Sequence, residues 1–162
     1  METVTRSAYE EERGKPMPSK LHSIAQTNLI VTLSGYRPKY QVLSELTLRL
    51  GDLDVTPDLV VYRDLSVDFS VDEVRVTEPP LTAVEIASPT QGMQDLLDKI
   101  RDLLEHGVQS CWLVLPPLKT ITVFTAGMES TTYSSGTITD PVTDIAVEWE
   151  AVFATPGSTS EA

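Results

Sequence analysis

The stretch "LTAVEIASPTQGMQDLLDKIRDLLEHGVQSCWLVLPP", residues 81–117, decides the fold of this chain. It opens with "LTAVEIASP", a short apolar segment typical of a strand buried on both faces. "QGMQDLLDKIRDLLEHG" follows with apolar residues at helical spacing, and Gly107 is a natural residue to end that helix. "QSCWLVLPP" is a second buried strand. The order strand, helix, strand predicts a βαβ unit in which residues 81–87 and 110–115 are parallel neighbours.

Working outward, the rest of the chain supplies more strands and one more helix. "SKLHSIAQTNLIVTL", residues 19–33, predicts a helix with Ser19 as its N-cap. "KYQVLSELTLRLGD", residues 39–52, alternates and predicts one strand. The remaining predicted strands lie in "TPDLVVYRD", "KTITVFTAG", "STTYSSG" and "TDIAVEW". We therefore expect an α/β (α+β) domain, with a mixed sheet of residues 56–62, 82–87 and 111–115 and a helix over 92–106 packed on it.

The composition is that of a globular protein. The chain has 162 residues, of which 41% are hydrophobic and 22% charged, so we expect one domain over residues 1–154 and a disordered tail at 155–162. No apolar run is long enough to cross a membrane, and the polar N-terminus has no secretory h-region. A single cysteine, Cys111, excludes an internal disulfide. These features predict a cytoplasmic protein without a membrane partner.

The charge distribution limits how the chain could bind nucleic acid. A net charge of −12 argues against a general polyanion-binding surface. Any phosphate contact would need a local patch, and the basic residues available for one are Arg6, Arg13, Lys15, Lys20, Arg37 and Lys39. The simpler interpretation, which we favour from the sequence, is a solvated N-terminal segment.

Two acidic residues stand in predicted buried strands. Asp58 follows Pro57 at the head of one strand, and Glu85 interrupts another. A buried carboxylate is unfavourable unless a positive group compensates it, and two facing carboxylates repel unless a cation lies between them. Mg²⁺ is a common solution, because it binds one or two carboxylates together with water and phosphate oxygens.

Lys99 adds a cation to this pair. It lies at the edge of the apolar stripe of the predicted helix, which packs back over the strand that contains Glu85. A lysine there could orient an attacking water or neutralise charge that develops on a phosphate.

Each of these residues also has a structural interpretation that stays open. Asp58 could cap a turn, Glu85 could bond to the backbone or to an arginine, and Lys99 could pair with Asp95 on a solvated helix flank. His22 fits a surface or core-edge histidine better than a catalytic one. Cys111 lies in an apolar strand and is interpreted as a core residue.

An ordered series of segments resembles a known family. "GKPMPSKLHSIAQTNL", "PDLVV", "LTAVEIASPT", "DLLDK", "GVQSCWLVLPP" and "ITVFTAG", ending at "EWEAVFA", are similar to the Uma-two family of restriction endonuclease-like proteins in the PD-(D/E)xK nuclease superfamily. The resemblance covers nearly the whole chain. It implies a restriction-endonuclease-like mixed sheet flanked by helices.

The resemblance also implies roles for individual residues. Asp58 would be the metal-binding aspartate and Glu85 the second acidic ligand, with the backbone carbonyl of Ile86 as a further ligand of Mg²⁺ or Mn²⁺. Lys99 would be the catalytic lysine, and His22 and Glu45 are candidate accessory residues.

The chain departs from the superfamily and family patterns at several positions. The superfamily lysine two residues after the acid is replaced by Ala87, and the family is similar in carrying its lysine on the next helix, as Lys99 is here. Leu103 stands where the family commonly has tyrosine. Cys111-Trp112 and Leu115-Pro116 replace its usual Tyr-Trp and Asp-Pro. None of these changes removes a predicted metal ligand.

Three functions are weighed on these residues. The first is a Mg²⁺-dependent endonuclease that hydrolyses phosphodiester bonds of nucleic acid, DNA by expectation, and acts as a homodimer. The second is a catalytically inactive relative that serves as a binding or assembly module. The third is a carboxylate-pair hydrolase such as a glycosidase, which would need no lysine at position 99.

Overall fold

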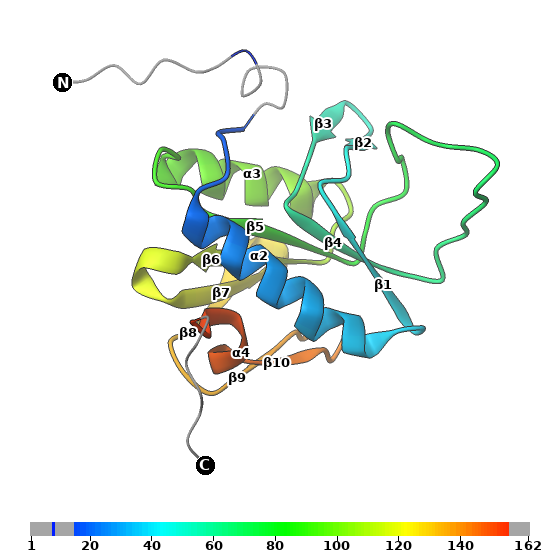
Figure 1. The fold of residues 1–162 in the computed structure, drawn as a ribbon. Coiled ribbons are helices and arrows are strands. Elements are labelled where there is room, and N and C mark those ends of the chain that lie inside the picture. Colours follow the sequence, from blue (N-terminus) through cyan, green and yellow to red (C-terminus); the bar gives the residue numbers. More distant parts are fainter. Residues whose placement is uncertain (1–7, 9–14, 156–162) are drawn as a thin grey trace.

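The computed structural model of the chain describes residue 8 and residues 15–155, and Figure 1 shows their arrangement. All of the predicted tail beyond Thr155 lies outside the described residues. The expectation of a mixed sheet flanked by helices is confirmed.

A six-stranded sheet forms the centre of the molecule, with strand order β1-β4-β5-β6-β7-β8. Its strands are β1 (Tyr40–Ser44), β4 (Leu59–Arg63), β5 (Thr82–Ile86), β6 (Ser110–Leu115), β7 (Thr120–Thr125) and β8 (Glu129–Tyr133). β5 and β6 are parallel, with Glu85 opposite Leu113, and every other neighbouring pair in this sheet is antiparallel. The predicted parallel pair is therefore present, and it gives the sheet its mixed character.

Helix α3 (Met93–Glu105) connects the two parallel strands and covers one face of the sheet (Figure 1). Leu96, Ile100 and Leu103 are the buried members of its apolar stripe, and they pack in one core cluster with Ala83 of β5 and Cys111 of β6. The helix ends as predicted, because Gly107 has a φ of 103°, a left-handed conformation that favours glycine.

Helix α2 (Lys20–Leu33) covers the opposite face, together with the short helix α4 (Trp149–Phe153) (Figure 1). Ser19 is the N-cap, as predicted, and its hydroxyl accepts a hydrogen bond from the amide of His22 at 3.2 Å. A hydrogen bond of 2.8 Å from Asn28 Nδ2 to the carbonyl of Val152 joins α2 to α4.

One sequence prediction is wrong in detail. Residues 39–52 do not form one strand, because the chain turns at Glu45, whose φ is 55°. β1 ends at Ser44, and β2 (Leu48–Leu50) pairs with β3 (Leu53–Val55) in a separate small sheet. The turn places Glu45 beside Asp58, and the amide of Glu45 donates to the carbonyl of Asp58.

Short elements complete the chain. The 3₁₀ turns η1 (Ser34–Tyr36), η2 (Pro116–Leu118) and η3 (Ala126–Met128) follow α2, β6 and β7. β9 (Thr137–Thr139) pairs with β10 (Ala146–Glu148), and both contribute to the core cluster on the side of the sheet that α2 covers. β10 matches a predicted strand, whereas β9 has three residues and α4 has five, which is too short for a periodic pattern to predict them from sequence.

The connection between β4 and β5 projects from the body of the molecule (Figure 1). Val67, Phe69, Val71 and Val74 are exposed in this connection, with Phe69 101% and Val74 83% exposed. Among the helices that the structure describes, none is both long and apolar enough to cross a membrane.

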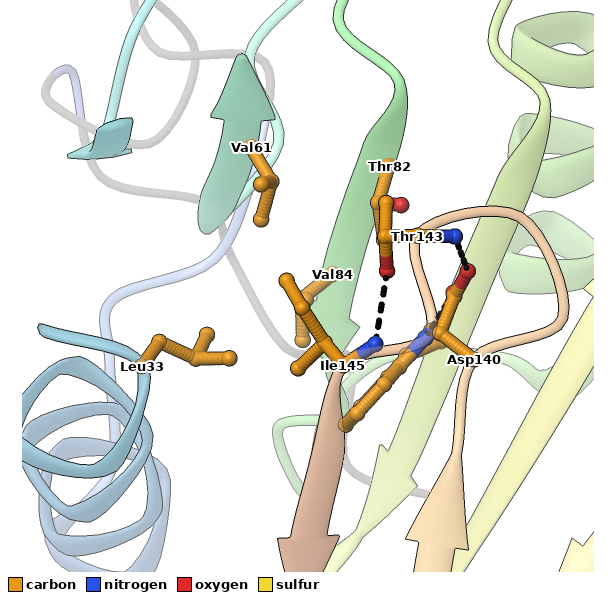
Figure 2. A pocket seen from close by; sticks show the side chains of 8 residues that line it. Leu33, Val61, Thr82, Val84, Asp140, Thr143 and Ile145 are labelled. Carbon is orange, nitrogen blue, oxygen red and sulfur yellow. Dashed lines mark hydrogen bonds between the residues drawn. The ribbon is translucent and has the colours of Figure 1, made fainter. Parts of the chain in front are cut away.

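Asp140 is a buried carboxylate, separate from Glu85, on the face of the sheet that α2 covers. Asp140 is fully buried beside a cavity of about 10 Å³, too small for more than one water (Figure 2). It accepts hydrogen bonds from Ser110 Oγ at 2.6 Å and Trp112 Nε1 at 2.7 Å. The amides of Val142 and Thr143 also donate to it, at 2.8 and 3.0 Å. With four donors, this carboxylate has a structural role.

Candidate active site

The structure brings Asp58, Glu85 and Lys99 together where β4 begins and β5 ends. Asp58 immediately precedes β4, Glu85 is the next-to-last residue of β5, and Lys99 lies in the middle of α3. Side chains alternate along a strand, so Glu85 lies on the same face of β5 as Ala83, which packs against α3. This alternation aims the carboxylate at Lys99.

Glu85 is 1% exposed and pairs with Lys99. The Lys99 ammonium lies 2.9 Å from Oε1 and 3.0 Å from Oε2, with hydrogen-bond geometry at Oε2, and Oε1 has no hydrogen-bond partner. The alternative pairing of Lys99 with Asp95 is not what the structure shows. Burial raises the pKa of Glu85 to about 7, because the charge of Lys99 offsets the loss of water only in part and the charge of Asp58 adds to it.

Asp58 is 2% exposed, and both of its carboxylate oxygens accept hydrogen bonds. Oδ2 accepts one from the amide of Ile86 at 2.7 Å. Oδ1 lies 2.6 Å from Lys15 Nζ and 3.1 Å from His22 Nε2. Burial alone would raise the pKa of Asp58, but the hydrogen bond from His22 and the charge of Lys15 outweigh it and lower that pKa. Asp58 is therefore a carboxylate held by three donors and not a simple turn cap.

The environment of Lys15 differs most from what the sequence predicted. We expected a solvated basic segment, yet Lys15 is 8% exposed, while Arg6 and Arg13 lie outside the described residues. Besides Asp58, its ammonium contacts Glu45 Oε2 at 2.9 Å and the carbonyl of Thr56 at 3.2 Å. Burial lowers the pKa of Lys15, but the surrounding negative charges, chiefly Asp58, reverse this and leave the pKa raised. Lys15 is therefore a buried ammonium ion.

One face of α2 supplies the remaining contacts. His22 was expected at the surface or the edge of the core, but it is 3% exposed and reaches Asp58, and its Nδ1 has no hydrogen-bond partner. Gln26, one turn later, donates to Glu45 Oε1 at 3.3 Å and to the carbonyl of Asp58 at 3.1 Å. His22 and Gln26 are four residues apart on a helix, and this spacing is the signal that could have found the pair.

Glu45 joins the group because of its backbone conformation. Its left-handed φ is uncommon for a residue with a side chain, and its amide donates to the carbonyl of Asp58 at 3.1 Å. Its side chain is 34% exposed and that of Lys99 is 21% exposed, whereas those of Asp58 and Glu85 are almost completely buried. Solvent therefore approaches the carboxylates past Glu45 and Lys99.

The carbonyl of Thr56 connects the two lysines. Lys15 Nζ donates to it at 3.2 Å and Lys99 Nζ at 3.3 Å. No sequence pattern indicated this residue, because a backbone carbonyl carries no side-chain signature.

The donor atoms suit a hard divalent cation. Asp58 and Glu85 offer carboxylate oxygens, which Mg²⁺ prefers, and buried Glu85 Oε1 has no hydrogen bond to lose. Across the described ranges, no group of three or more His, Cys, Asp or Glu side chains could hold a metal ion. A cation here would therefore rest on two carboxylates and main-chain oxygen.

Comparison with known proteins gives a family and a similar solved structure. The family model Uma2, described as "Putative restriction endonuclease", matches residues 9–153. A crystal structure described as "a putative nuclease belonging to DUF820", from Anabaena variabilis ATCC 29413, has a TM-score of 0.75 and 22% sequence identity, covering 85% of this chain and 83% of that one. At that identity the likeness establishes the fold alone. No curated protein matches the chain.

Proposed function

Since the chain belongs to the Uma-two family, whose model spans residues 9–153, we propose that it is an endonuclease that hydrolyses phosphodiester bonds of DNA with Mg²⁺ or Mn²⁺. Family membership supports a nuclease-like function. The observation that carries the finer proposal is the pairing of Glu85 with Lys99 beside Asp58, in a fold shared with a nuclease-family structure.

Asp58, Glu85 and the main-chain carbonyl of Ile86 would hold the cation. When bound, such an ion polarises a phosphoryl oxygen and lowers the pKa of a bound water. His22 and the Ile86 amide position the Asp58 carboxylate, at 3.1 and 2.7 Å.

Lys99 is the group that would act on the substrate. Its ammonium is anchored by Glu85 and the carbonyl of Thr56, and its side chain is 21% exposed. A preorganised cation there stabilises the negative charge that develops on a phosphate oxygen, or orients the attacking water.

We extend the proposal to the assembly and its setting. Nucleases that cut both strands of a duplex need two sites, and a homodimer supplies them. The exposed apolar residues in the connection between β4 and β5, Val67, Phe69, Val71 and Val74, are the surface that such a dimer would bury. The protein would act in the cytoplasm, where Cys111 stays a buried thiol.

Two observations favour a second function. Asp58 already has three hydrogen-bond donors, and the net charge of −12 opposes DNA binding. Both features fit a catalytically inactive relative that has kept the fold as a binding or assembly module.

A cleavage assay separates the two. Wild type would be incubated with linear duplex DNA, single-stranded DNA and RNA, with Mg²⁺, with Mn²⁺ or with EDTA. We expect metal-dependent cleavage of DNA, and loss of about 100-fold or more in rate for Glu85→Gln and Lys99→Met. Lys119→Met, an exposed lysine that is not among the residues in contact with Asp58 and Glu85, is the matched control. Equal cleavage by wild type and Glu85→Gln would reveal a contaminating nuclease, and that result rejects the proposal.

A further inference from the structure

The ammonium group of Lys15 is surrounded by oxygen atoms. Asp58 Oδ1 lies at 2.6 Å, Glu45 Oε2 at 2.9 Å and the carbonyl of Thr56 at 3.2 Å. We propose that Lys15 occupies a position for a divalent cation, so that the cation binds there only after the ammonium has left Asp58. The inference rests on the proposed function, because it concerns the same carboxylates, and it adds Glu45 and Thr56 as ligands.

The chemistry of these three oxygens supports the proposal. Two belong to carboxylates and one to a main-chain carbonyl, which are the ligands that Mg²⁺ and Mn²⁺ accept. An ammonium has three hydrogens to donate, and Lys15 has one acceptor for each. The lysine thus donates to all three oxygens. Without it, the negative charges of Asp58 and Glu45 would lie close together with little water between them.

Asp58 has no room for both cations on the same oxygen. A carboxylate oxygen has about two lone-pair sites, and Oδ1 already faces Lys15 and His22. A divalent ion bound to Oδ1 would therefore replace a donor. It would also lie close to the Lys15 charge in a site with little water, where like charges repel strongly. When Lys15 leaves, Oδ1 has a free lone pair and the repulsion between the two cations is gone.

A second observation concerns Glu85, the other buried carboxylate of the site. Glu85 is 1% exposed, its Oε1 has no hydrogen-bond partner, and its negative charge acts on Lys15. Glu85 Oε1 lies 2.9 Å from the Lys99 ammonium but without hydrogen-bond geometry, so it could coordinate a cation without giving up a hydrogen bond.

The position of Lys15 in the chain allows it to leave. It lies in an irregular segment before α2, which begins at Lys20, so no helix or strand fixes its backbone. Its path to solvent runs past Glu45, whose side chain is 34% exposed. Lys15 is on this basis an exchangeable counter-ion that stabilises the cation-free protein and weakens the affinity for the cation.

The test is Mn²⁺ binding, measured by electron paramagnetic resonance of the free ion during titration. Lys15→Met removes the ammonium while keeping an unbranched side chain, and Lys20→Met, an exposed lysine five residues later, is the control for the same change in net charge. We expect Lys15→Met to bind Mn²⁺ about tenfold or more tightly than wild type, and Lys20→Met to match wild type. Adding Glu45→Gln to Lys15→Met should reverse most of the gain.

Thermal melts without metal show whether Lys15→Met is folded, and Lys15→Gln replaces it if it is not. A folded variant at position 15 that binds Mn²⁺ no more tightly than wild type overturns the inference. If wild type still cleaves DNA with Mg²⁺, the proposed function survives that result. Conversely, tight binding by Lys15→Met in a protein that never cleaves supports the inference and rejects the proposed function.

Discussion

Lys99 lies 2.9 Å from Glu85 Oε1, although the two residues are 14 positions apart and belong to a helix and a strand. The contact exists because α3 returns over β5 after the loop that follows Ile86. It brings a charged pair into a face of the sheet that is otherwise apolar, where Ala83 and Leu113 are the neighbours of Glu85. Such a pair contributes little to stability compared with apolar residues, and the proposed function gives a reason for its presence.

Glu85→Gln tests this role through the pH dependence of stability. The folded-state pKa of Glu85 is raised to about 7, above the ordinary value of 4.5. Its contribution to stability is therefore fully present below pH 4.5 and is lost as the pH rises through 7. Glu85→Gln cannot ionise at this position and so does not lose stability as the pH rises. At pH 8 without metal, its melting temperature should therefore equal that of wild type or be higher by up to about 5 °C. Melts from pH 5 to pH 8 measure the difference, which should grow with pH. Unfolding of Glu85→Gln at pH 8 would make Glu85 a structural residue.

Metal should stabilise the wild type. A ligand that binds only the native state raises its stability, so we expect a higher melting temperature with millimolar Mg²⁺ or Mn²⁺ than with EDTA. Asp58→Ala and Glu85→Gln should abolish this gain, and Lys99→Ala should keep most of it, because lysine is not a ligand. Asp58→Ala should also lower the free energy of unfolding by about 3–5 kcal/mol, since it removes the shortest ion pair of the buried Lys15. Absence of any metal effect in all four proteins would count against metal dependence.

Asp140→Ala should be strongly destabilising and have no effect on metal binding. The change would remove the acceptor of four hydrogen bonds, two from side chains and two from main-chain amides. We expect a loss of at least about 3 kcal/mol in urea unfolding, because buried donors would remain unsatisfied. Val142→Ala in the same turn is a suitable control, since its amide is retained. A loss below 1 kcal/mol, as seen for typical surface changes, would show that water replaces the carboxylate.

His106 should titrate above the ordinary histidine range. Its Nδ1 lies 2.7 Å from the carbonyl of Asp102 and its Nε2 lies 3.0 Å from Asp52 Oδ1. Both acceptors can be satisfied only by the doubly protonated ring, which raises the pKa of His106. Stability from this contact is present below pH 6.5 and is lost as the pH rises through the raised value. A proton NMR titration of wild type and Asp52→Asn checks this, with a lower midpoint expected for the variant; identical midpoints would exclude a role for Asp52.

The sequence predicted the elements whose patterns are local. The leucine stripe of α3, Gly107 at its end and the N-cap Ser19 are each decided by residues within a few positions, and all three are as predicted. The interruption of residues 39–52 was missed, because the left-handed backbone of Glu45 is stabilised by a hydrogen bond to Asp58 that no local pattern reveals.

The residues of the candidate site also differ in whether a local sequence pattern indicates them. Asp58, Glu85 and Lys99 were proposed from the sequence because each is a charge in a segment that should be apolar, and the structure brings the three together. Lys15 gave no such signal, since it lies in the segment "GKPMPS", which predicts no strand or helix, and its contact with Asp58 spans 43 positions. Its importance follows from tertiary structure alone.

The Ile86 amide donates a hydrogen bond to Asp58 Oδ2, so this main-chain amide can be used to detect changes at the Asp58 carboxylate. The β4–β5 ladder ends at the pairing of Leu59 with Val84, so this amide bonds a side chain where a strand neighbour would otherwise stand. Its deuterium exchange rate and its nitrogen chemical shift should therefore follow whatever occupies the Asp58 carboxylate. Lysine, cation or neither can then be distinguished in the intact protein, without substrate and without turnover.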